Sequence, residues 1–311
     1  MSWITVALLA YLFLAVSNLF DKFLIDHVIS SSKAYAFVAC LLGGIVVVAA
    51  PWLLEWPGWR LFFWDVCLGF IFALALWFLY EALKRGEAAK TLVLVGGVVP
   101  VFSILLSVVF LKEKFNLDQW GGLGLLVLGT FLIAFLPSHR SFLSRVVRHL
   151  GISQKVGLDG LFFALISGVA YALYFVGSKY AFNGQSFASA FIWARLGAAF
   201  FVLLFLLQRK SRREIFKFLH VSSPQKHKFL VLLGQGFGSL GFILQNYAIF
   251  LGSVALVNAL QGVQYAFILL ISAILAFSAP KMLKESFTGL IILQKTAAVF
   301  LIGLGLYFIA L

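Results

Sequence analysis

Charged residues are scarce in this sequence. Asp, Glu, Lys and Arg together make up 11% of the 311 residues, whereas about 25% is usual in soluble globular domains. Hydrophobic residues reach 63%, and the mean hydropathy is +1.05. A water-soluble fold of this size exposes too much surface to hide that many apolar side chains. The composition therefore excludes a soluble enzyme, a nucleic-acid-binding module and a disordered chain, and it indicates a polytopic integral membrane protein.

Patterns typical of catalysis, metal binding and nucleotide binding are also missing. The two cysteines, Cys40 and Cys67, lie inside apolar runs and form neither a disulfide framework nor a metal-ligand pair. The five histidines lie between apolar runs, without a Cys, His or carboxylate at ligand spacing. The sequence has no Ser-His-Asp set and no Gly-Lys-Ser/Thr phosphate loop. We therefore expect no catalytic residues, no metal, no cofactor and no ATP hydrolysis, so energy must come from gradients or from the solute itself.

Long apolar runs predict ten membrane-spanning helices, because a helix needs about 20 apolar residues to cross the hydrocarbon core. The runs are continuous, which argues against the short alternating strands of a β-barrel. The first run lacks a basic leader, so we interpret it as a span and not as a cleaved signal peptide. The runs cover residues 3–22, 34–54, 61–83, 88–111, 118–136, 157–180, 187–207, 228–250, 254–278 and 289–310.

Three short motifs recur in the same order, which indicates an internal duplication. Each motif occupies an equivalent place in a plan of five spans followed by five spans. The matching pairs are Leu111-Lys112-Glu113-Lys114-Phe115 with Leu283-Lys284-Glu285-Ser286-Phe287, Gly86-Glu87-Ala88-Ala89 with Gly252-Ser253-Val254-Ala255, and Asp21-Lys22-Phe23 with Ser178-Lys179-Tyr180.

The duplication predicts an all-α integral membrane fold made of two inverted five-helix repeats. The first repeat covers residues 1–137 and the second covers residues 157–311, with a basic linker at residues 138–156. An odd number of spans per repeat makes the second copy enter the membrane from the opposite side. Secondary transporters commonly use this arrangement, with a binding site near the midplane.

The same plan resembles the drug/metabolite transporter superfamily, in its EamA-like branch. The residues that carry the resemblance are Gly86-Glu87-Ala88-Ala89, Pro100-Val101-Phe102, Phe110-Leu111-Lys112-Glu113-Lys114-Phe115 and the following glycines Gly121, Gly122, Gly124 and Gly129. The second half is the more divergent copy, because no proline in the ninth run matches Pro100. The resemblance implies transport of small metabolites through a central cavity without ATP hydrolysis, with both termini in the cytoplasm.

Loop charge predicts the opposite orientation. Eighteen of the 24 Lys and Arg residues lie in odd-numbered loops and four lie in even-numbered loops. Basic loops stay in the cytoplasm, so we predict a multi-pass protein of the plasma (inner) membrane with its odd-numbered loops inside and both termini outside. Two basic segments, 142–150 and 215–219, also have apolar residues at helical spacing. They predict interfacial helices that contact anionic lipid, for anchoring or, alternatively, for regulation.

Polar side chains within the apolar runs are the candidates for solute binding, although many such residues only join helices. In the ninth run, Asn258, Gln261 and Tyr265 share one helical face and Gln264 lies off it. The glycines of Gly234-x-Gly236-x-Gly238-x-x-Gly241 predict close helix packing. The full set of cavity candidates is Asn18, Lys22, Trp77, Tyr80, Glu81, Tyr171, Tyr174, Gln245, Asn258, Gln261 and Tyr265.

Charged residues near or inside the spans allow two interpretations. Asp21 and Glu81 are candidates to carry a coupling proton, although residues near span ends also extend into lipid headgroups. Arg195 and Lys295 lie deep in their runs, and we interpret them as structural partners of groups on other spans. Lys179 has the same two possible roles as Lys22, solute contact or anchoring.

Taken together, the sequence predicts a secondary transporter of a small polar or amphipathic metabolite, with export favoured, that works by alternating access. The expected partners are that solute and membrane lipids, without nucleic acid, and a monomer is sufficient. One alternative is a translocase of lipid or lipid-linked sugar with the same fold. Another is a membrane scaffold or sensor that transports nothing.

Overall fold

The computed structural model describes residues 2–28, 31–85, 88–134, 158–220, 225–278 and 289–310. Within these ranges the protein consists of helices, and no strand occurs. At several helix ends, including residues 21–28, 225–231 and 289–295, the backbone is described without its side chains.

The helices follow the predicted apolar runs, because each run can satisfy its backbone hydrogen bonds internally only as a helix. The first part of the chain forms α1 (Trp3–Val28), α2 (Ser32–Gly43) with η1 (Gly44–Ala49) and α3 (Ala50–Leu53), α4 (Trp59–Arg85), α5 (Ala88–Leu106) with η2 (Ser107–Leu111), and α6 (Leu117–Ala134). The second part forms α8 (Leu158–Phe182), α9 (Phe187–Leu203) with η3 (Leu204–Leu207), α10 (Arg209–His220), α11 (Gln225–Leu251), α12 (Val254–Ala259), α13 (Gln261–Ser278) and α14 (Gly289–Ala310).

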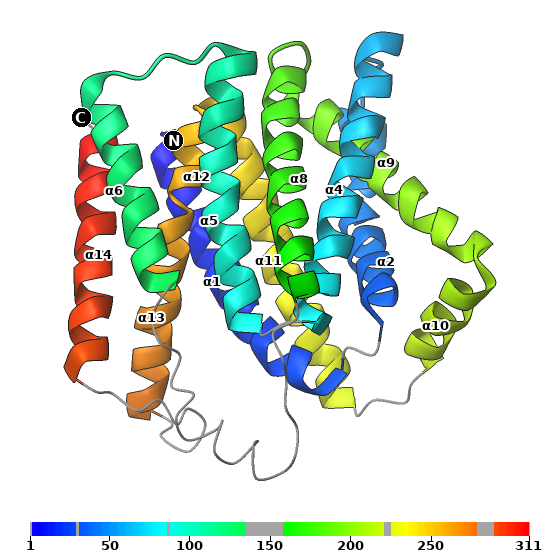
Figure 1. Cartoon of the computed structure of the whole chain (residues 1–311). Coiled ribbons are helices and arrows are strands. Elements are labelled where there is room, and N and C mark those ends of the chain that lie inside the picture. The colour runs from blue at the N-terminus through cyan, green and yellow to red at the C-terminus, as the bar shows by residue number, and fades with distance from the viewer. Residues whose placement is uncertain are drawn as a thin grey trace.

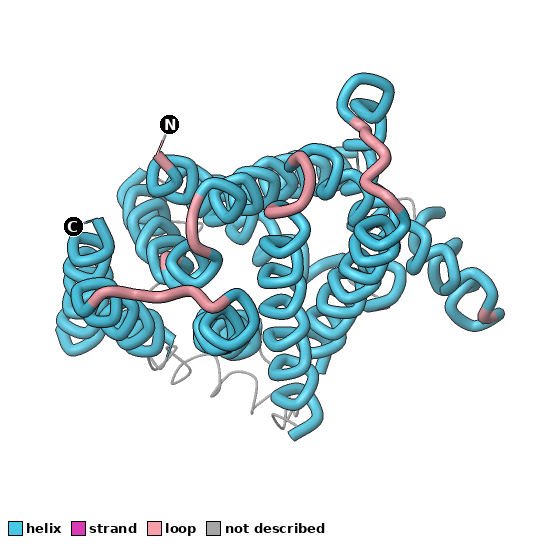
Figure 2. Tube along the Cα trace, turned by 90° about the horizontal axis from the view of Figure 1, so that it is seen from above, coloured by secondary structure: helices cyan, strands magenta, loops and turns pink. Residues whose placement is uncertain are grey.

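Among the residues that the structure describes, six helical segments are long and apolar enough to cross a membrane, and three further apolar helices are shorter. Most helices run along a common direction, whereas α9 slants away from the bundle and leads to α10 at its edge (Figure 1). Both termini lie toward the same end of the bundle, the upper end in Figure 1. The view from above shows the helices packed side by side around the bundle centre (Figure 2).

The largest helix pairings join the two parts of the chain. Helix α1 packs along α11, α4 packs against both α8 and α9, and α6 packs along α14. At the α1–α11 contact, a Cβ on Gly238 would lie 2.8 Å from Ser17 Oγ and one on Gly241 would lie 3.0 Å from the Ala10 carbonyl oxygen. The glycine run in α11 therefore permits close helix packing, as predicted. Gly236 differs from its neighbours, because open space surrounds it.

Helix α10 is amphipathic, as expected for the second basic segment. Ile215 and Ser211 are buried, whereas Arg212, Arg213 and Lys217 are exposed. The helix packs on α2 and on η3. The first basic segment, residues 142–150, lies outside the described residues.

Candidate functional site

A cavity of about 250 Å³ lies at the centre of the bundle. Its walls come from α1, α2 with η1, α4 and α5 in the first part of the chain, and from α8, α9, α11 and α13 in the second. The polar lining side chains are Tyr11, Ser17, Asn18, Tyr80, Tyr171, Arg195, Gln235, Ser239, Gln245, Gln261, Gln264 and Tyr265. Phe72, Phe175, Phe191 and Phe242 supply aromatic walls. The lining is thus amphipathic, with amides and hydroxyls set among aromatic rings.

The helical segment that covers the ninth run is interrupted between α12 and α13. This interruption affects which side chains reach the cavity. Helix α12 ends at Ala259 and α13 begins at Gln261, so Leu260 occupies a turn. Spacing in one continuous helix therefore does not relate Asn258 to Tyr265. Gln261, Gln264 and Tyr265 line the cavity, whereas Asn258 does not. The placement of Gln264 differs from the sequence expectation, because the predicted face assumed an unbroken helix.

Asn258 joins three helices instead. Its side chain is fully buried. Its Nδ2 donates to Ser103 Oγ at 2.8 Å, and its Oδ1 accepts from Gln245 Nε2 at 3.2 Å. The Tyr11 hydroxyl lies nearby and donates to the Val257 carbonyl oxygen at 2.7 Å. These bonds tie α1, α5 and α11 to α12 near the upper end of the bundle.

Arg195 lies in an aromatic cage at the wall of the cavity. Its Cζ atom is 4.0 Å from the centre of the Phe72 ring, 4.4 Å from that of Phe242 and 4.8 Å from that of Phe191. Its Nη2 donates to the Tyr174 hydroxyl at 3.4 Å. Within the described part of the chain, no carboxylate forms an ion pair with Arg195. The expected structural partners on other spans are thus the rings of Phe72 and Phe242 and the hydroxyl of Tyr174, whereas Phe191 lies on the same helix as Arg195.

The cage does not replace the water that a guanidinium loses on burial. Three aromatic faces at about 0.5–2 kcal/mol each offset much of the several kcal/mol that burying an ion costs. They supply none of the oxygen acceptors that the N–H groups lose with that water. The available signal for this residue is an arginine deep in an apolar run that contains no acid. The sequence analysis interprets Arg195 as structural, and the cavity candidates do not include it.

Tyr174 and Tyr171 have different positions, although both come from α8. Tyr171 lines the central cavity. Tyr174 lies outside that lining, is almost fully buried and donates its hydroxyl to Asn246 Oδ1 at 3.2 Å. Gln245 belongs to the lining and also donates from Nε2 to the Tyr11 hydroxyl at 3.3 Å.

The candidates at the end of α4 are divided between two places. Tyr80 lines the central cavity and packs edge-on against Tyr35, with ring centres 4.6 Å apart. Trp77 lies beside that cavity under Lys33, whose Nζ is 5.0 Å from the Trp77 ring centre. The buried Trp77 Nε1 has no hydrogen-bond partner among the described residues.

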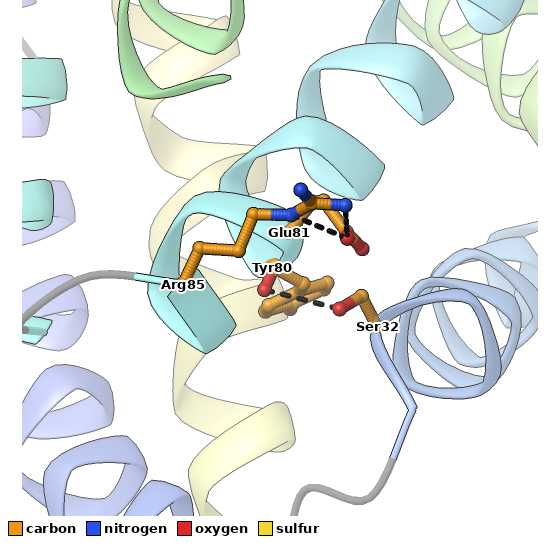
Figure 3. A network of polar contacts seen from close by, with 4 residues as sticks. All are labelled: Ser32, Tyr80, Glu81 and Arg85. Atoms are coloured by element: carbon orange, nitrogen blue, oxygen red, sulfur yellow. Dashed lines mark hydrogen bonds and ion pairs between the residues drawn. The ribbon is translucent and has the colours of Figure 1, made fainter. Parts of the chain in front are cut away.

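Glu81 faces away from the central cavity. Its Oε1 accepts two hydrogen bonds from Arg85, at 2.8 Å from Nε and 2.7 Å from Nη2 (Figure 3). Beside this pair, Ser32 Oγ donates to the Tyr80 carbonyl oxygen at 3.2 Å. Glu81 lines a separate polar cavity of about 230 Å³ together with Lys33 and Lys84. Of the other charged candidates, Asp21, Lys22 and Lys295 have side chains that lie outside the described residues.

Asp65 is a buried carboxyl group that sequence reasoning did not single out. It is 1% exposed, and its Oδ2 accepts from Gln185 Nε2 at 2.6 Å. Its Oδ1 and the Oε1 of Gln185 have no hydrogen-bond partner among the described residues. An acid in the apolar run 61–83 was the available signal. Lys179, by contrast, has an evident structural role, since its Nζ donates to two carbonyl oxygens at the end of α11, 2.9 and 3.1 Å away.

Two comparisons with known proteins found a match. One concerns the fold of nearly the whole chain, and the other concerns the sequence of its first part. A solved structure titled only "Crystal structure of protein" has a TM-score of 0.65 and 18% sequence identity, over 98% of this chain and 94% of that chain. That likeness shows a shared fold alone. No curated protein matches this chain. Residues 1–135 match the EamA-like transporter family, which is the family that the sequence motifs resemble.

Proposed function

We propose that this protein is a secondary transporter that moves a small polar or amphipathic metabolite by alternating access, with export as its direction. The observation that carries the proposal is the central cavity, which both parts of the chain line together. Substrate sites of this kind lie between two halves that rock against each other. The EamA-like match over residues 1–135 adds a transporter family to this geometry.

We also propose that the protein has ten membrane spans, arranged as two inverted repeats at residues 1–137 and 157–311. The helix pairings support it. If α1 corresponds to α8 and α4 to α11, exchanging the repeats converts the α1–α11 pairing into the α4–α8 pairing, and both are extensive. The α6–α14 pairing converts into itself. A two-fold exchange of five-helix units predicts these pairings, whereas the extensive α4–α9 pairing has only a slight α2–α11 counterpart.

Charge supports one orientation in the plasma (inner) membrane. The exposed basic residues of α10, together with Lys84 and Arg85, lie at the end of the bundle opposite the termini (Figure 1). We therefore propose that this end faces the cytoplasm and that both termini lie outside. Anionic lipid is the proposed partner of the basic face of α10.

Metabolite redistribution in cells tests the transport function. Cells expressing the wild type, a Gln261→Ala/Gln264→Ala variant and a Gln119→Ala control are compared for solutes inside and outside, at equal membrane levels. Gln119 makes its hydrogen bonds to Asn116 after the η2 turn, away from the cavity. We expect one small solute to redistribute with the wild type and the control and to do so less with the double variant. Profiles that all match the empty vector would contradict the proposal.

A pH series on the same cells tests proton coupling. The sequence pointed to Asp21 or Glu81 as the carrier. The Glu81–Arg85 pair outside the central cavity does not favour Glu81 in that role. A transport rate that does not change with pH would remove proton coupling from the proposal.

A further inference from the structure

We propose that the central cavity selects small organic anions, with a carboxylate or phosphate group bound at Arg195 and an apolar, aromatic body against the surrounding rings. The inference rests on the proposed transport function and narrows its substrate class. Three features carry it: the charge of the lining, the unused donors of Arg195, and the size and character of the walls.

The charge of the lining is positive. Arg195 lines the cavity and is 5% exposed. The other described side chains of the lining are neutral, and no carboxylate is among them. A charge in a site of low dielectric acts on a solute far more strongly than it would in water. The cavity therefore attracts anions and repels cations.

The guanidinium also has donors to offer. It carries five N–H groups, and the described residues supply one acceptor, the Tyr174 hydroxyl at the long distance of 3.4 Å. Three aromatic ring centres lie within 4.8 Å of its Cζ, and none of these rings supplies an oxygen acceptor. The N–H groups of a guanidinium lie in its plane and point outward along its edges. A carboxylate or phosphate can accept two parallel bonds from such an edge, an arrangement specific to Arg.

The walls favour a small aromatic body. Phe72, Phe191 and Phe242 surround Arg195 and belong to the lining, so a ring attached to the anionic group meets other rings. Gln261 Oε1 is buried without a hydrogen-bond partner among the described residues and is free to accept an N–H or O–H group of the solute. The cavity of about 250 Å³ is small beside ligand pockets of about 300–1,000 Å³, which suits a metabolite better than a lipid-linked sugar.

Binding of matched probes to the purified full-length protein in detergent tests this inference. The probes are 3-phenylpropionate, its neutral amide, the corresponding cationic amine 3-phenylpropylamine, and phenyl phosphate, each measured by calorimetry. We expect the carboxylate to bind about tenfold more tightly than the amide, with no binding of the amine. Comparing phenyl phosphate with 3-phenylpropionate shows whether the site prefers a phosphate or a carboxylate. Tighter binding of either one than of the amide supports the proposal.

Variants locate the effect. Arg195→Gln should lower carboxylate affinity about tenfold while the amide affinity stays within twofold, which also reports that the cavity has folded. Arg195→Lys should keep part of the preference, because the charge remains without the planar fork. Arg60→Gln is the matched control, since Arg60 is exposed outside the cavity and its Nη2 also donates to a tyrosine hydroxyl, that of Tyr180, at 2.6 Å.

Each remaining outcome is decisive. Three results would overturn the anion proposal: binding of both oxyanions no tighter than that of the amide, binding of no probe at millimolar concentration, or an equal loss of affinity in Arg60→Gln. Counterflow in liposomes separates it from the transport proposal. Uptake of the carboxylate and the amide at equal rates, both unchanged in Arg195→Gln, keeps transport and rejects anion selection. Binding of the carboxylate that depends on Arg195, without uptake of any probe, keeps the anion site and rejects transport.

Discussion

Replacing Asn258 with alanine should lower the free energy of unfolding by about 1–3 kcal/mol, because the variant loses two buried interhelical hydrogen bonds. Interhelical bonds in membranes average about 0.6 kcal/mol each, so two such bonds give about 1.2 kcal/mol as the lower value. The upper value follows from about 1.5 kcal/mol per net bond. Asn258 is fully buried, so solvent cannot replace the bonds lost at Ser103 and Gln245.

Unfolding of the purified protein in mixed micelles, followed by circular dichroism, measures this effect. Asn183→Ala is the matched control, because Asn183 is exposed in the turn after α8. The control should change stability by less than about 0.5 kcal/mol. A double-mutant cycle with Ser103→Ala should give a coupling energy of about 0.6–1.7 kcal/mol.

Two results would refute the structural role of Asn258. One is a loss of stability no larger than that of Asn183→Ala. The other is a coupling energy of zero with Ser103→Ala. If the structural role holds, transport by Asn258→Ala should fall only in proportion to the amount of folded protein in the membrane.

Three further predictions concern packing, helix ends and a surface ion pair. Gly69→Ala should cost about 1–3 kcal/mol in thermal unfolding, since its Cβ would meet the backbone of α9. Gly236→Ala should instead gain up to about 1 kcal/mol, because it adds helix propensity in open space, and equal effects would contradict the packing. Lys179→Met should lower stability by about 1 kcal/mol through the uncapped end of α11, and an unchanged midpoint would reject that role. Glu81→Gln should cost less than about 0.5 kcal/mol because the partly exposed Arg85 pair is weak, and it should leave transport unchanged, which an uptake assay checks.

The sequence predicts which polar residues lie in the ninth run better than it predicts which of their side chains face the cavity. The polar side chains of the ninth run were recognised, but their common face required one continuous helix. The turn at Leu260 places Gln264 in the cavity lining and leaves Asn258 outside it. The local signal for this turn is weak, because Leu260 is itself a strong helix former and only Gly262, two residues later, disfavours a continuous helix. Here the tertiary packing of α12 against α5 overrides the propensity of the segment.

For charged residues too, some partners can be predicted from the sequence and others cannot. Glu81 was a candidate for coupling because it lies near a span, yet its partner is Arg85, four residues along the same helix. That i,i+4 pair was visible in the sequence. Of the rings around Arg195, Phe191 has the same i,i+4 spacing on its own helix, whereas Phe72 and Phe242 come from α4 and α11 and could not be predicted from the sequence.

The membrane class, the helical segments and the family resemblance follow from the amino-acid sequence. Each depends on local quantities: the transfer free energy of a run of side chains, the obligatory hydrogen bonding of a backbone in lipid, and short motifs. The tertiary structure alone decided that Arg195 meets aromatic rings instead of an acid and that Gln261 and Gln264 face one cavity. Those outcomes depend on how each helix is rotated and on what packs against it, and both are set by contacts between residues far apart in the chain.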